Sequence, residues 1–164
     1  MTDEGYLKRM AAWYGQLSEA ERTAPVNLYL YQPARAEYDV RFGGRKDARD
    51  IAALFTLARR QLGNGGITDG FYMLALADTV EKMDIQVYEH YRVLADLLLE
   101  AARAALGSQD PRVLCALMKG VRLGLLDPEK YLPAARGAFE SAGPCAETAG
   151  FYQRALREYG RCME

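Results

Sequence analysis

Apolar residues that recur at helical spacing, in segments separated by short Gly- and Pro-containing breaks, are the feature that most constrains this chain. The segment 47–62 shows the pattern best, since Ile51, Leu54 and Phe55 begin a series spaced by three and four residues. This spacing places the apolar side chains on one face of an amphipathic helix. The glycine-rich run 63–66 then ends the pattern. We therefore expect a mainly helical chain.

The same periodicity, together with helix-start signals, predicts roughly seven helices. Asp110-Pro111 and Asp127-Pro128 each combine a capping side chain with proline at the first helical position, where the missing N–H costs nothing. The last but one helix begins either at Asp127 or at Pro133. Short loops favour antiparallel neighbours, so the helices are expected to pair into hairpins. The expected helices cover approximately residues 3–21, 47–62, 69–83, 86–106, 110–124, 127–142 and 146–161.

One segment has a different period. In residues 26–31 aliphatic side chains alternate with Asn and Tyr, and in residues 38–42 apolar side chains alternate with charged ones. A period of two is typical of strands, and Pro33 lies between the two runs where the chain could turn. This pattern predicts a small β-hairpin near residues 26–42, packed on helices or on another chain.

Composition excludes several classes of function. With 164 residues the chain is expected to form one domain, 1–164, and its net charge of −1 gives no drive toward nucleic acid or anionic lipid. The sequence has no apolar run of membrane-spanning length and no basic, apolar leader at its start, so we expect a cytoplasmic protein. His90 is the only histidine and has no ligand partner at metal-site spacing, so neither a metal nor a cofactor is expected.

Two blocks of sequence carry a resemblance to a known family. Residues 70–81 (GFYMLALADTVE) and 116–126 (ALMKGVRLGLL), continued by 131–135 (YLPAA) and 138–140 (AFE), resemble segments of the unsaturated glucuronyl and rhamnogalacturonyl hydrolases. The similarity spans residues 70–142. It implies a fold related to an (α/α) barrel of six helical hairpins, of which this chain is long enough for about half. It also implies a glycoside hydrolase ancestry, with unsaturated uronic acid oligosaccharides as substrates.

The resemblance implies a set of site residues. Asp69 precedes Gly70-Phe71-Tyr72-Met73, which is similar to the family's D-G-L-Y-M motif, and would be the general acid. A plain helix N-cap is the simpler interpretation of Asp69, because the helix N-terminus favours an ionised carboxylate rather than an acid. The candidate substrate-binding residues are Trp13, Asn64, Phe71 and Tyr72.

The sequence also departs from the family. In the ungapped alignment Ile67 replaces an arginine and Phe71 replaces a tryptophan, and the aromatic stretch before the second block is missing. An isoleucine cannot replace the forked cation that binds a carboxylate. The departures favour a catalytically impaired relative that retains an oligosaccharide ligand.

The alternative is a non-enzymatic helical module for protein–protein interaction, forming a homodimer. A half-barrel leaves apolar helix faces uncovered, and a second copy is the simplest cover. The chain's tyrosines, such as Tyr29 and Tyr31, suit either a carbohydrate groove or a protein interface.

Overall fold

A computed structural model describes residues 3–141 and 143–164, and these residues form nine α-helices and no strand. The mainly helical expectation is confirmed. A π-helical turn, Asp39–Gly43, continues α3, and a short 3₁₀ helix, Ile85–Val87, precedes α6. The helices are α1 (Asp3–Gln16), α2 (Glu19–Arg22), α3 (Pro25–Tyr38), α4 (Ala48–Gly66), α5 (Gly70–Lys82), α6 (Tyr88–Ala104), α7 (Pro111–Arg122), α8 (Pro128–Ser141) and α9 (Ala149–Cys162).

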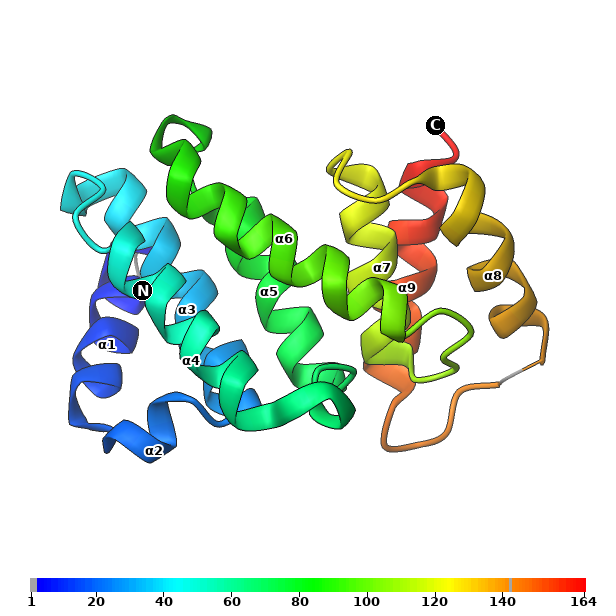
Figure 1. The fold of residues 1–164 in the computed structure, drawn as a ribbon, viewed down its shortest axis with the longest axis horizontal. Helices are drawn as coiled ribbons and strands as arrows, with labels where there is room; N and C mark the ends of the chain where they lie inside the picture. Colours follow the sequence, from blue (N-terminus) through cyan, green and yellow to red (C-terminus); the bar gives the residue numbers. More distant parts are fainter. Residues whose placement is uncertain (1–2, 142) are drawn as a thin grey trace.

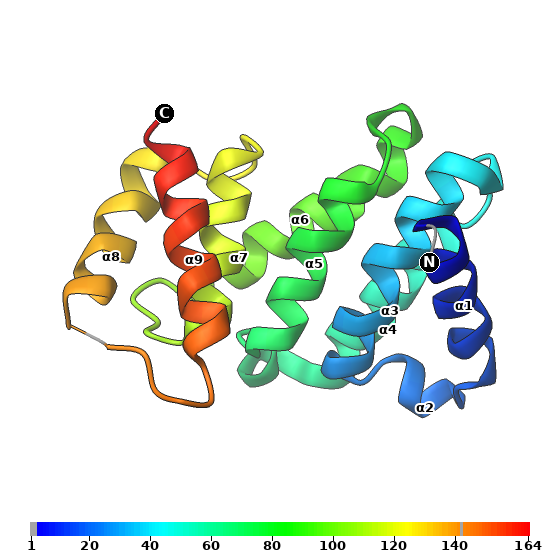
Figure 2. The same ribbon diagram turned by 180° about the vertical axis from the view of Figure 1, so that it is seen from behind.

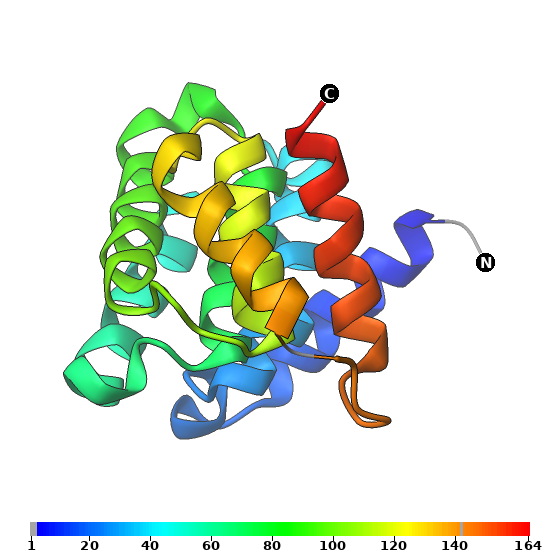
Figure 3. The same cartoon turned by 90° about the vertical axis from the view of Figure 1, so that its right-hand side faces the viewer.

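Alternate helices form two layers. Helices α3, α5, α7 and α9 lie side by side in that order and run in the same direction, with α1 antiparallel beside α3 (Figure 2). Helices α4, α6 and α8 return in the opposite direction (Figure 1). Seen from the α8 and α9 end, α6 and α9 lie on opposite sides of the molecule (Figure 3). Helices α1 and α9 occupy the two ends of the row. The face of the row that is turned away from α4 and α6 is not covered by a second layer of helices in the part of the chain that the structure describes, and we call it the open face (Figure 2).

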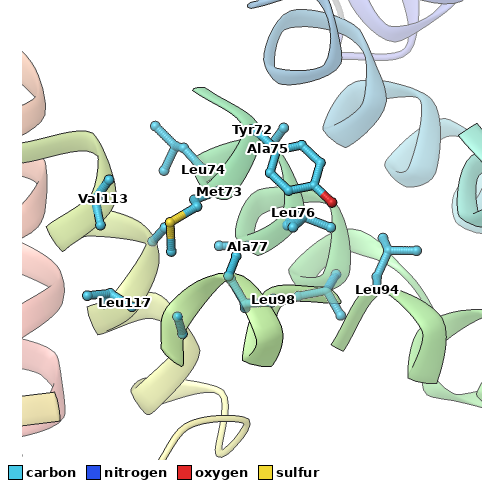
Figure 4. Packing of buried hydrophobic residues seen from close by; sticks show 14 of the residues in the cluster. Tyr72, Met73, Leu74, Ala75, Leu76, Ala77, Leu94, Leu98, Val113 and Leu117 are labelled. Atoms are coloured by element: carbon cyan, nitrogen blue, oxygen red, sulfur yellow. The ribbon is translucent and has the colours of Figure 1, made fainter. Parts of the chain in front are cut away.

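Helix α5 is the centre of the core. It packs against α3, α6 and α7, and every residue from Tyr72 to Val80 is buried. Figure 4 shows how its side chains meet Leu94 and Leu98 of α6 and Val113 and Leu117 of α7. A helix that is apolar nearly all round needs neighbours on several sides, which explains its place in the middle of the row. Each fully buried Leu contributes roughly 1.5–3 kcal/mol by leaving water.

The expected β-hairpin near residues 26–42 is wrong, because this segment forms α3 and the π-helical turn. The buried side chains of α3 include Leu28, Gln32 and Ala36, which are spaced by four residues. Leu30, which a strand would place on the same face as Leu28, is 46% exposed. The apparent alternation arose because large apolar side chains also lie on the exposed face of this helix.

The turn expected at Pro33 is also wrong, because proline does not end this helix. Pro33 lies inside α3 and Pro133 lies inside α8, and both helices continue through them. A proline in a helix removes one backbone hydrogen bond and costs about 3 kcal/mol, which the packing of α3 against α1 and α5 offsets. Helix α8 starts at Pro128, the earlier of the two expected positions.

Other boundaries differ by smaller amounts. The first expected helix, 3–21, is divided at Ser18, whose side chain forms a capping box with Glu21 and starts α2. The helix expected to stop at Gly63 turns sharply there, with a positive φ of 63°, and resumes to Gly66. Glycine is needed at this turn because an L side chain is strained at positive φ.

Two glycines allow close packing around α7. A Cβ on Gly70 would lie 2.7 Å from Arg112 Nε, and a Cβ on Gly120 would lie 2.6 Å from Leu126 Cδ1. The first glycine allows the start of α5 to approach the start of α7. The second allows the chain after α7 to fold back over that helix. The close packing places the polar side chains of α5 and α7 within reach of each other.

Candidate functional site

Charged side chains of three adjacent helices meet near the C-terminal ends of α5 and α7. Lys119 Nζ of α7 donates to Asp78 Oδ1 at 2.7 Å and to Glu81 Oε2 at 2.5 Å, both on α5. Arg122 of α7 also donates to Glu81. The two carboxylates and the two cations are each separated by three residues, so each pair lies on one helix face. These contacts tie α5 to α7.

Helix α9 completes the cluster. Arg154 Nη2 donates to Asp78 Oδ1 at 2.5 Å, and Glu158 Oε2 accepts from Arg122 Nε at 2.7 Å. Lys119 and Glu158 are each 4% exposed, so their charges are held away from water. We call Asp78, Glu81, Lys119, Arg122, Arg154 and Glu158 the ion cluster. Buried charges persist only when they are paired and hydrogen-bonded, and each member of the ion cluster is.

The pKa shifts of Glu81 and Lys119 show how the ion cluster acts on its members. Burial alone would raise the pKa of Glu81, but hydrogen bonds from Lys119 and Arg122 outweigh burial and hold the pKa below its ordinary value. Burial would lower the pKa of Lys119, but Asp78 and Glu81 outweigh it and raise that pKa. Both directions favour the charged forms. The helix dipole adds to this at α7, because cations are favoured near a helix C-terminus.

A groove lies beside the ion cluster on the open face of the row. Its volume is about 260 Å³, close to the lower end of the roughly 300–1,000 Å³ of small-molecule sites. Glu37 and Lys82 form an ion pair of 3.0 Å within it. The groove is lined by Tyr6 and Leu7 of α1, Tyr29, Leu30, Pro33, Ala34 and Glu37 of α3, and Asp78 and Lys82 of α5.

Asp78 belongs to both the groove and the ion cluster. Its Oδ1 accepts from Lys119 and Arg154, whereas no group in residues 3–141 or 143–164 donates a hydrogen bond to its Oδ2. One carboxylate oxygen is therefore fixed and the other keeps its capacity to accept. The side chain of Asp78 is largely buried, so it contributes to the floor of the groove rather than to its rim.

Two aromatic rings line the groove, Tyr6 of α1 and Tyr29 of α3, and Tyr29 packs against rings of α5 and α9. Tyr29 lies 5.5 Å from Phe71 and 6.1 Å from Phe151 between ring centroids, and Phe71 lies 5.9 Å from Phe151. Burial raises the pKa of Tyr29, against the opposing effect of the nearby Arg154 cation. Tyr29 is therefore a neutral phenol, with a ring held in place by α5 and α9. Tyr6 is 45% exposed on the opposite wall.

The structure places the sequence-predicted residues in different surroundings. The carboxylate of Asp69 accepts from the backbone N–H groups of Phe71 and Tyr72, as the N-cap of α5. Tyr72 is completely buried and packs against Phe55. Phe71 contacts the groove only through Tyr29, and the guanidinium of Arg112 lies 4.7 Å over its ring.

The two remaining predicted residues are on the surface. Asn64 follows the turn at Gly63, where its Oδ1 accepts from Arg59. Trp13 is 52% exposed on α1, seven residues after Tyr6 and so two turns along the same helix face. None of the five predicted residues lines the groove. Phe71 reaches it only through the ring of Tyr29, Tyr72 is inside the core, and Asn64 is on α4, which contributes no residue to the groove.

The ion cluster was not predicted as a site, although its sequence signal was visible. Asp78 and Lys119 both interrupt apolar helical stretches, each followed by a second charge three residues later. Charges at buried positions of a helix require partners of opposite sign, so the acidic pair on one helix and the basic pair on the other could have been expected to bind each other. Asp78 and Lys119 lie in the two blocks that carry the family resemblance, and their pairing was not predicted.

Residues 3–141 and 143–164 contain no group of three or more metal-ligating side chains, and no helix among them is long and apolar enough to span a membrane. No protein-family model, curated protein or solved structure matches the chain.

Proposed function

We propose that this chain is a non-catalytic, carbohydrate-binding relative of the unsaturated uronyl hydrolases, and that the groove on α1, α3 and α5 is its binding site. The observation that carries the proposal is the occurrence of tyrosine rings and Asp78 in the lining of one groove, where Asp78 Oδ2 has no hydrogen-bond donor among the described residues. Apolar ring faces pack against a sugar ring, while a carboxylate oxygen accepts hydrogen bonds from hydroxyl groups.

The carboxylates argue against hydrolysis. Glycosidases of the ordinary type need a general acid whose pKa is raised. Among the described residues, every carboxyl group with a shifted pKa is shifted downward, as Glu81 is. Asp69 Oδ1 accepts two backbone hydrogen bonds as the N-cap of α5, which is a structural role. The proposal therefore assigns binding, and no catalytic step, to this chain.

The arrangement of helices supports the relation to a barrel. The block 70–81 covers nearly all of α5, the block 116–126 covers the C-terminal half of α7 and the loop after it, and the two helices lie side by side. Parallel helices in one layer with returning helices in the other is the arrangement expected for consecutive hairpins of an (α/α) barrel. We propose that the row from α1 to α9 corresponds to a part of such a barrel, and that its open face corresponds to the inner wall.

Titration calorimetry with unsaturated uronic acid disaccharides tests the binding proposal. Tyr6→Ala should weaken binding about fivefold, as expected for the loss of one ring contact worth roughly 1 kcal/mol. The matched control is Tyr88→Ala, which removes another exposed tyrosine, on α6 and outside the groove. Equal affinities of the two variants would contradict the groove as the binding site. No heat of binding with any disaccharide would contradict carbohydrate binding.

A homodimer is the second candidate function, and one observation favours it. Helices α1 and α3 expose four large apolar side chains, although α1 packs mainly on α3. Their positions are Tyr6, Trp13, Val26 and Leu30. Exposed apolar side chains that gather on neighbouring helices mark interaction surfaces, and a second copy could cover them through a twofold axis.

Light scattering during size-exclusion chromatography separates the candidates. If the dimer forms through this surface, Trp13→Glu should convert it to a monomer, and the groove residues Tyr6 and Leu30 would be covered in the dimer. The control Ile85→Glu changes an equally exposed apolar side chain outside this surface. A wild-type chain that elutes as a monomer at high concentration would exclude the dimer and leave the groove open.

A further inference from the structure

A second concave site lies on α9 and is formed almost entirely by arginine. A cavity of about 170 Å³ is lined by Arg154, Arg157, Glu158 and Arg161, which we call the arginine pocket. These residues are spaced by three and four positions, so they share one face of the helix. None of the four was singled out by the sequence, and the groove described above does not include them.

The arginines of the pocket differ in how they are held. Arg154 is fixed by Asp78, and Arg161 Nη1 donates to Glu158 Oε1 at 3.2 Å. Arg157 forms no hydrogen bond or ion pair with any residue in the described part of the chain, and it is exposed. The pocket therefore combines one anchored guanidinium, one partly engaged guanidinium and one with all its donors free.

Charge in this region is unbalanced. Lys119, Arg122, Arg154, Arg157 and Arg161 face only three carboxylates, those of Asp78, Glu81 and Glu158, which leaves a surplus of two positive charges. The whole chain has a net charge of −1, so this surplus is local to α7 and α9. The only carboxylate in the pocket, Glu158, is already bound by Arg122 and Arg161.

We propose that Arg154, Arg157 and Arg161 form a binding site for a phosphate group. A phosphate dianion matches the surplus of two charges, and its tetrahedral oxygens accept the forked, paired hydrogen bonds that guanidinium groups donate. The ion cluster fixes Arg154 before the ligand binds, so binding costs little side-chain entropy at that residue. The inference stands on α9 and does not depend on the proposed carbohydrate site.

The test is a titration of the intact chain with inorganic phosphate, followed through the arginine side-chain NMR signals at constant ionic strength with chloride as reference. Phosphate should shift the Nε–Hε signals of Arg154, Arg157 and Arg161. Arg157→Gln should weaken binding about tenfold, corresponding to the loss of one charge-assisted hydrogen bond. The control Arg60→Gln changes an exposed arginine of α4 and should leave the affinity unchanged.

A second arm distinguishes the source of the phosphate. Vesicles of phosphatidylcholine containing phosphatidic acid present the same group on a lipid surface, and co-sedimentation measures binding. Vesicle binding that is lost in Arg157→Gln would identify a lipid headgroup as the source. Phosphate binding without vesicle binding would identify a soluble phosphate ester. The proposal is overturned if neither probe binds, or if Arg157→Gln, with an unchanged circular dichroism spectrum, binds both as well as the wild-type chain.

Discussion

Lys119 is the residue on which the ion cluster depends most. It is buried on α7 and, among the residues that the structure describes, is the only cation that contacts both Asp78 and Glu81 of α5. A buried ion pair is weak evidence for net stability, because removing the charges from water costs several kcal/mol. Removal of one partner is different, since it leaves the remaining buried charges with fewer partners: Asp78 keeps only Arg154 and Glu81 only Arg122 among the described residues.

We expect Lys119→Met to destabilise the chain by about 3 kcal/mol, because Asp78 and Glu81 would each lose a buried partner. Urea unfolding followed by circular dichroism measures the change. Lys8→Met is the control, since Lys8 is exposed on α1, and its change should stay within about 0.5 kcal/mol. Similar values for the two variants would mean that the ion cluster contributes little.

Glu81 makes stability depend on pH in the acid range. Its folded-state pKa lies below the ordinary value of 4.5, so its contribution is present above pH 4.5 and is lost as the pH falls through the lower, folded value. Unfolding free energies measured from neutral to acid pH should therefore decline less steeply below pH 4.5 in Glu81→Gln than in the wild-type chain. Parallel pH profiles would contradict the assigned pairing with Lys119 and Arg122.

At the scale of elements, α3 shows what local patterns can and cannot predict. The capping side chains Asp69 and Asp110 act within their own helix, and both were recognised as helix starts. The face that α3 buries is decided by α1 and α5, which are distant in sequence, so a local reading took exposed Val26 and Leu30 for part of a strand. The ion cluster was missed for the same reason, since its three helices meet only in the fold.

A pair of substitutions distinguishes the helix from the strand. Leu28→Ala should cost about 2–5 kcal/mol because Leu28 is completely buried, whereas Leu30→Ala should cost less than about 0.5 kcal/mol because Leu30 is 46% exposed. A strand would place both side chains on one face and give similar losses. Thermal or urea unfolding of the two variants measures the difference, and equal losses would contradict the helical assignment of α3.

For the whole molecule, the ion cluster connects two surfaces of different chemistry. The groove on α1, α3 and α5 combines tyrosine rings with Asp78, and the arginine pocket on α9 carries surplus positive charge. The ion cluster lies between them, because Asp78 lines the groove and its partner Arg154 lines the pocket. A substitution such as Asp78→Asn would therefore affect both surfaces, whereas Tyr6→Ala and Arg157→Gln each address one.

Binding without hydrolysis is most directly tested in one NMR sample of the labelled chain with an unsaturated uronic acid disaccharide. We predict that backbone amide signals of Tyr6, Leu30 and Glu37 shift during the titration, while the signal of the sugar's double bond keeps its intensity over prolonged incubation. Loss of the double-bond signal would contradict the non-catalytic assignment. Amide shifts confined to residues outside the groove, or no shifts at all, would contradict the assigned site.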